Sequence, residues 1–149
     1  MLKDVIIYIT GLQYAQSERG PEDVQLIAPG EYYFKNGSHY LVYDEVGDSP
    51  DEKYKNIIKF KPEYLEVTKK GQYNTKLVFE TNKKTLSQYE TPMGLMYIGI
   101  STKSVKLKEE PDLIELKADY TMDINNNFIA DCSVSLTAKS RESGIDLTN

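Results

Sequence analysis

The chain has 149 residues, of which 40% are hydrophobic, and its nine glycines bring the combined set near the average of globular domains. The formal net charge is −5, twelve residues are tyrosine, and there is no tryptophan. These values exclude an intrinsically disordered, collagen-like or mucin-like chain. The length is that of one domain, so we expect a single domain over 1–149 with an ordered core over about 3–139.

The single cysteine, Cys132, cannot form an internal disulfide, which favours a reducing compartment and hence a cytoplasmic location. It falls on the apolar side of its expected strand and is interpreted as an inert core thiol. No apolar run approaches the roughly 18 residues that a transmembrane segment needs, and the N-terminus shows no signal-peptide pattern. We therefore expect no membrane contact.

In chain order, almost every apolar run has period two or is a short β-branched block, which is typical of strands. Clusters of Gly, Pro and Asn separate the runs. Strands are predicted over 3–12, 23–35, 38–45, 54–61, 64–70, 74–82, 86–91, 95–103, 113–124 and 129–139. The one segment expected to form a helical turn or two is 50–56.

The clearest local prediction is a hairpin over 31–43, because Asn36-Gly37 suits the two left-handed positions of a type I′ turn. This turn sets Phe34 opposite His39 and Tyr32 opposite Leu41. The more apolar face of the hairpin is predicted to point inward, and it carries Tyr32, Phe34, His39, Leu41 and Tyr43.

The last two strands repeat this alternation, with Tyr120 and Met122 on the apolar side of the first and Cys132 on that of the second. A three-residue Asn-rich loop, with Met122 opposite Cys132, lets the two apolar sets share a face. Pro29-Gly30 and Gly99 interrupt strand patterns, where a bulge or a corner is expected.

Sequential, one-sided antiparallel strands form either a sandwich or a closed barrel. Short and evenly spaced hairpins favour the barrel, and closure removes exposed edges. We therefore predict an all-β fold, a single closed antiparallel barrel of about 8–10 strands.

Two stretches resemble a known family, the YwiB-like family of small bacterial proteins of unknown function. The first is Glu31-Tyr32-Tyr33-Phe34-Lys35-Asn36-Gly37 with Tyr43-Asp44-Glu45, and the second is Tyr89-Glu90-Thr91-Pro92-Met93-Gly94 with Ser101-Thr102-Lys103-Ser104. The strand at 119–123 follows them in similar order, so the likeness covers about 3–139. The resemblance implies a lipocalin-like closed barrel. It carries over no catalytic or binding residue.

The chain contains no phosphate-binding loop, dinucleotide fingerprint, paired-cysteine motif or EF-hand loop, so we expect no cofactor and no metal. Ser38 and His39 are adjacent on a strand and point to opposite faces, which argues against nucleophilic catalysis by this pair. We expect a protein that is not an enzyme. His39 is either an acid, base or pH sensor, or a hydrogen-bonded histidine near a barrel rim, and the second is preferred.

Two functions fit these observations. The first is a carrier or sensor of a small, partly apolar ligand inside the barrel, although ordinary core packing is the preferred interpretation of the same rings. The candidate ligand-binding residues are Tyr32, Phe34, His39, Tyr43 and Tyr120.

The second function is an interaction module that binds an acidic protein or RNA. Residues 53–84 hold nine lysines and three carboxylates, although the solvated outer face of strands is the preferred interpretation. The candidate residues of this basic surface are Lys59, Lys61, Lys69, Lys70 and Lys76. Nucleic acid is disfavoured because the acidic chain has only two arginines, Arg19 and Arg141.

Overall fold

The structure, a computed structural model, describes residues 3–11, 25–46, 51–125 and 127–141. Ten strands account for most of them. They are β1 (Asp4–Thr10), β2 (Gln25–Lys35), β3 (Ser38–Val46), β4 (Lys53–Lys61), β5 (Tyr64–Lys70), β6 (Thr75–Glu80), β7 (Lys84–Thr91), β8 (Gly94–Glu110), β9 (Leu113–Ile124) and β10 (Asn127–Ser140). Every predicted strand is present. The expected strand positions 12 and 23–24 lie outside the described residues.

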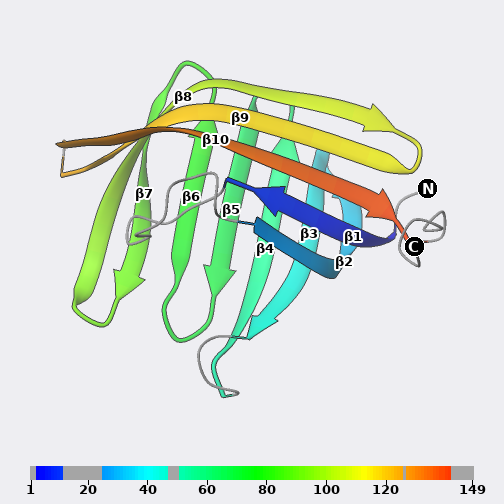
Figure 1. Ribbon diagram of the computed structural model, residues 1–149, viewed down its shortest axis with the longest axis horizontal. Coiled ribbons are helices and arrows are strands. Elements are labelled where there is room, and N and C mark those ends of the chain that lie inside the picture. The colour runs from blue at the N-terminus through cyan, green and yellow to red at the C-terminus, as the bar shows by residue number, and fades with distance from the viewer. Residues whose placement is uncertain (1–2, 12–24, 47–50, 126, 142–149) are drawn as a thin grey trace.

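The strands pair antiparallel with their neighbours and close into a barrel, because β1 pairs with both β2 and β10. The predicted closed antiparallel barrel is therefore confirmed. Figure 1 shows the barrel as two crossing layers, with β8, β9, β10, β1 and β2 running in front of β3 to β7. Two long strands belong to both layers: β2 pairs first with β1 and then with β3, and β8 pairs with β7 and then with β9.

Glycines stand where β2 and β8 pass from one layer to the other. A Cβ on Gly30 would lie 2.5 Å from Ile7 Cδ1 and 2.7 Å from the carbonyl oxygen of Val42. A Cβ on Gly99 would lie 2.6 Å from both carboxylate oxygens of Asp123. The expected corner positions therefore serve close approach between strands, which larger residues would prevent.

The β2–β3 hairpin has the predicted register, with Phe34 opposite His39 and Tyr32 opposite Leu41. Asn36 (φ 52°) and Gly37 (φ 81°) both adopt the left-handed conformation that a type I′ turn requires. This turn brings Tyr32 and His39 to the same end of the barrel.

Three local expectations are wrong. The segment expected to be helical enters strand β4 at Lys53, because pairing with β3 overrides a weak helix-start signal. Strand β8 continues to Glu110 rather than ending at residue 103, since it gains a backbone partner in β9. Met122 faces Ala130, not Cys132, and a bulge between Phe128 and Ala130 rather than a three-residue loop aligns the two apolar sets.

Aliphatic and aromatic side chains fill the middle of the barrel. The largest fully buried side chains include Phe60, Phe79, Ile58, Ile98 and Ile100. Cys132 is buried in the same core, as predicted. Among the described residues there is no helix with the length and apolar character that crossing a membrane would need.

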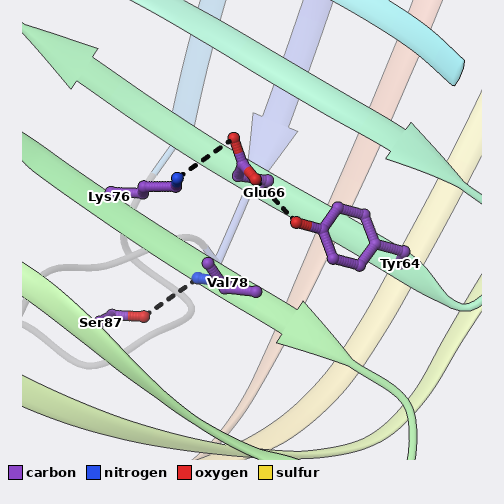
Figure 2. A network of polar contacts seen from close by, with 5 residues as sticks. All are labelled: Tyr64, Glu66, Lys76, Val78 and Ser87. Atoms are coloured by element: carbon purple, nitrogen blue, oxygen red, sulfur yellow. Dashed lines mark hydrogen bonds and ion pairs between the residues drawn. The ribbon is translucent and has the colours of Figure 1, made fainter.

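The β6–β7 seam is bridged partly by side chains. Only Thr75 with Tyr89 and Lys76 with Gln88 pair through the backbone among the described residues. Further along, the Val78 N–H donates to Ser87 Oγ at 3.0 Å, as Figure 2 shows, and the Thr85 hydroxyl donates to the Val78 carbonyl. Side-chain hydroxyls thus replace part of the backbone ladder.

Candidate functional site

The structure separates the predicted ligand-binding residues into three places. Tyr32, Phe34 and His39 lie together at one end of the barrel. Tyr43 is buried nearer the opposite end, where it faces Asn56 on β4. Tyr120 is buried in the core and packs edge-on against Phe79, with ring centroids 4.8 Å apart. Buried side chains occupy the middle of the barrel, and a depression lies at each of its two ends.

The first end, here called the histidine end, is a depression of about 410 Å³. It is lined by Tyr32, Phe34, His39, Glu109, Glu110, Pro111 and Ile114. The ring of His39 is buried and stacks on Phe60, with an interplanar angle of 9°. His39 Nε2 lies 3.2 Å from a Glu109 carboxylate oxygen, and His39 Nδ1 lies 2.6 Å from the Tyr32 hydroxyl.

These contacts define the protonation of His39. A carboxylate can only accept a hydrogen bond, so His39 Nε2 carries a proton and donates to Glu109. In the neutral ring, Nδ1 is then unprotonated and accepts a hydrogen bond from the Tyr32 hydroxyl. Burial lowers the pKa of His39, while the Glu109 charge opposes this to a smaller extent. Burial, followed by the Glu109 charge, raises the pKa of Tyr32. Both ring nitrogens therefore have partners, which supports a structural role for His39.

Phe34 does not face the interior, and the expectation that it does is wrong. Its side chain is 61% exposed. It sits one residue before the Lys35–Ser38 pair that closes the hairpin, so its inward side meets the open end of the barrel rather than the core. The ring touches His39 edge-on, with centroids 4.9 Å apart.

The opposite end, which is the lower one in Figure 1, holds a second depression of about 410 Å³, here called the lysine cup. The lining residues on the barrel strands are Tyr54, Lys69, Thr75, Tyr89, Glu90 and Thr91, and those beside them at the rim are Glu52, Gln72, Tyr73 and Pro92. Polar side chains thus replace the aliphatic lining found in the middle of the barrel.

Strand register explains why these polar groups meet. Leu65 and Val67 on β5 are buried, so alternation directs Lys69 to the same interior side. Lys69 is directly opposite Asn56 on β4 and Thr75 on β6, and Thr75 is opposite Tyr89 on β7. One row of inward positions therefore crosses four strands.

A carboxylate and an aromatic ring hold Lys69 inside the cup. Its Nζ lies 3.2 Å from Glu45 Oε1 and 4.6 Å from the centroid of the Tyr54 ring. Glu45 also accepts a hydrogen bond of 3.2 Å from Nδ2 of Asn56, which is fully buried. Both side chains of this ion pair are partly exposed, so the pair lies at the mouth of the barrel and not in its apolar core.

Thr75 is the one cup residue whose buried side-chain oxygen has no hydrogen-bond partner among the described residues. Its side chain is 6% exposed, next to Lys69 in the same row. Unpartnered buried hydroxyls are uncommon in native proteins and need an explanation.

The tyrosines of the cup supply ring faces and polar tips. Burial, followed by the nearby Tyr54, raises the pKa of Tyr89, so the Tyr89 phenol stays protonated near neutral pH. Glu90 Oε1 accepts from the Asn74 N–H at 2.8 Å and is thereby fixed at the rim.

The predicted basic surface is partly dispersed. Lys69 points into the cup, whereas Lys70 is exposed on the other side of β5. Lys59 lies over the Tyr40 ring at 5.9 Å, and Lys61 lies over the Tyr64 ring at 5.6 Å.

Lys76 joins a polar network on the outer face, shown in Figure 2. Its Nζ is 4.0 Å from Glu66, which also accepts a 2.7 Å hydrogen bond from Tyr64. Burial, with this hydrogen bond, raises the pKa of Tyr64 well above its ordinary value. Part of the positive charge is thus compensated locally.

Sequence reasoning missed Tyr54, Thr75 and Tyr89 as site residues and placed Lys69 on the outside. Strand alternation did contain the signal, because Lys69 has the same parity as Leu65 and Val67. Polar residues occupy the last inward-facing positions of several strands. Only the register between the strands shows that these positions lie side by side. Among the described residues, no group of three or more His, Cys, Asp or Glu side chains is placed to hold a metal ion.

Comparisons with known proteins agree on the fold and are silent on activity. A family model described as "Domain of unknown function (DUF1934)" matches residues 7–136. The crystal structure of the ywiB protein from Bacillus subtilis is similar, with a TM-score of 0.68 and 22% sequence identity over 92% of this chain and 88% of that chain. No curated protein matches significantly. The resemblance to the YwiB-like family is thereby confirmed.

Proposed function

The chain belongs to the DUF1934 family, and from the lysine cup we propose that it binds a small molecule there, as a carrier or sensor. The ligand places a polar group beside Thr75 and Lys69 and a flat, partly apolar body against the tyrosines. The proposed ligand site thus lies at the mouth of the barrel, whereas the sequence-based hypothesis put it inside the barrel.

The observation that carries this proposal is the Thr75 hydroxyl. It is buried, lines the cup and has no partner among the described residues. A buried unsatisfied hydroxyl costs about 1–3 kcal/mol, which a ligand oxygen or nitrogen would recover.

The size and lining of the cup support the same function. Its volume of about 410 Å³ is within the range of small-molecule sites. Tyr54, Tyr73 and Tyr89 combine apolar rings with hydroxyl tips, which suits a ligand that has both characters.

The test is a binding titration with a small naphthalene-based fluorescent probe. We expect one probe molecule per chain, and we expect Thr75→Val to weaken probe binding while raising the free energy of unfolding by about 1 kcal/mol. Thr102→Val is the matched control, because Thr102 is also buried and unpartnered but does not line the cup. It should raise stability and leave binding unchanged. Absence of saturable binding, or equal weakening by both substitutions, contradicts the proposal.

The alternative, an interaction module for an acidic protein or RNA, has less support. Lys69 points into the cup and pairs with Glu45, and Lys76 on the outer face pairs with Glu66, so both charges are compensated locally. We propose a non-enzymatic protein, and we place it in the cytoplasm on the basis of its single, buried cysteine.

A further inference from the structure

We infer that Glu45 occupies the place of a ligand carboxylate, and that the lysine cup therefore selects monocarboxylates with a flat apolar body. This inference rests on the proposed function and names its ligand class. In the free protein, Glu45 pairs with Lys69 at 3.2 Å. A bound carboxylate takes over that ammonium group.

The position of Lys69 favours a carboxylate oxygen at the floor of the cup. Lys69 and Thr75 are direct cross-strand partners, so their Cβ atoms are about 4.5–5.5 Å apart. In the free protein the ammonium group lies on the β3 and β4 side of Lys69, against Glu45 and the Tyr54 ring. Once it leaves Glu45, the flexible Lys69 side chain and the Thr75 hydroxyl on the neighbouring strand each offer one donor to an oxygen of the same carboxylate. The unpartnered hydroxyl of Thr75 gains a partner in the same step.

Glu45 is able to leave Lys69 without becoming an isolated buried charge. Asn56 Nδ2 donates to the same Oε1 atom at 3.2 Å, and Asn56 itself is 1% exposed. The side chain of Glu45 is 35% exposed, against 21% for Lys69, so the carboxylate already reaches solvent. When a ligand carboxylate displaces Glu45 from Lys69, Glu45 therefore loses the ion pair but keeps the hydrogen bond from Asn56 and its contact with solvent.

The other charges at the cup set the ligand charge at −1. Glu52 and Glu90 at the rim repel a second negative group, which disfavours dicarboxylates and phosphates. A cationic ligand would compete with Lys69 for Glu45 and the Tyr54 face. A single carboxylate that points inward avoids both conflicts.

The experiment compares three probes with one ring system by isothermal titration calorimetry: 2-naphthylacetate, the neutral 2-naphthylacetamide and the cationic 2-naphthylmethylamine. For the wild-type chain we expect the carboxylate to bind about tenfold or more tightly than the amide, which corresponds to about 1.4 kcal/mol. The amine should bind more weakly than the amide. This comparison requires no variant and is independent of any folding defect.

Two substitutions then test the exchange itself. Glu45→Gln removes the competing charge, so it should tighten binding of the carboxylate by about tenfold and leave the amide unchanged. Lys69→Met should abolish the preference for the carboxylate over the amide. Glu66→Gln is the matched control, because it removes a carboxylate from a lysine pair on the outer face and should change neither affinity.

The outcomes separate the two proposals. Equal affinity for carboxylate and amide, or weaker carboxylate binding by Glu45→Gln, overturns the carboxylate inference while small-molecule binding stands. Preferred binding of the amine overturns it as well. If none of the three probes binds, both proposals fail.

Discussion

His39 provides a test at the scale of one residue, since the chain has only one histidine. Burial lowers its pKa below the ordinary value of 6.5, although Glu109 opposes the shift. The folded state thus prefers the neutral ring, whereas the unfolded chain takes up a proton as the pH falls through 6.5. His39 therefore stabilises the fold above this pH, and that contribution is lost on acidification.

We expect the free energy of unfolding, measured by urea titration, to decrease between pH 7.5 and pH 5.5. In His39→Gln, the decrease over the same interval should be smaller. The groups facing His39 are Tyr32 and Glu109, and tyrosine does not titrate in this range. Stability that is constant or rises on acidification would show that the Glu109 charge outweighs burial.

Gly30 gives a second prediction at the residue scale. A Cβ there would meet both Ile7 and the Val42 carbonyl, so Gly30→Ala should lower the free energy of unfolding by about 1–3 kcal/mol. Pro29→Ala, at the exposed neighbouring position of β2, should change it by less than about 1 kcal/mol. Thermal or urea unfolding measures both. Equal changes in the free energy of unfolding for the two substitutions would mean that the close approach of the strands does not require a glycine at residue 30.

At the scale of elements, the β6–β7 seam depends on Ser87. Its Oγ accepts the Val78 N–H, where the two strands no longer pair through their backbones (Figure 2). Ser87→Ala should destabilise the fold by about 1–3 kcal/mol, since it leaves a partly buried donor without its partner. Hydrogen exchange at the Val78 amide should accelerate. Ser133→Ala, at an exposed position of β10, is the control, and unchanged exchange at Val78 would contradict this role.

Elements differ in how far the sequence specifies them. The residue types Asn36-Gly37 specify a two-residue type I′ turn, and this turn fixes which residues of β2 and β3 are paired, so the register could be predicted to the residue. The register of β9 with β10 could not, because a bulge depends on packing across the whole sheet rather than on the loop. The extension of β8 through Glu110 likewise required the partner strand β9.

At the scale of the whole molecule, alternation and turn residues were sufficient to predict a closed antiparallel barrel. The site was harder, because it lies at one end of the barrel and combines residues from neighbouring strands. Lys69 and Thr75 become neighbours only through the β5–β6 register, and no turn between them encodes it in the way that Asn36-Gly37 does. Phe34 shows a second limit of prediction from the sequence. Alternation correctly assigns the side of the strand on which Phe34 lies, but it does not show that the apolar interior of the barrel ends before this residue.

The central claim is that the lysine cup, and not the histidine end, is the ligand site. The most direct measurement is a two-dimensional ¹H–¹⁵N NMR titration of the whole chain with 2-naphthylacetate. We predict saturable shift changes at the amides of Tyr54, Lys69, Thr75 and Tyr89, with Phe34, His39 and Glu109 unaffected. Changes concentrated at the histidine end, or no saturable change at either end, would contradict the account.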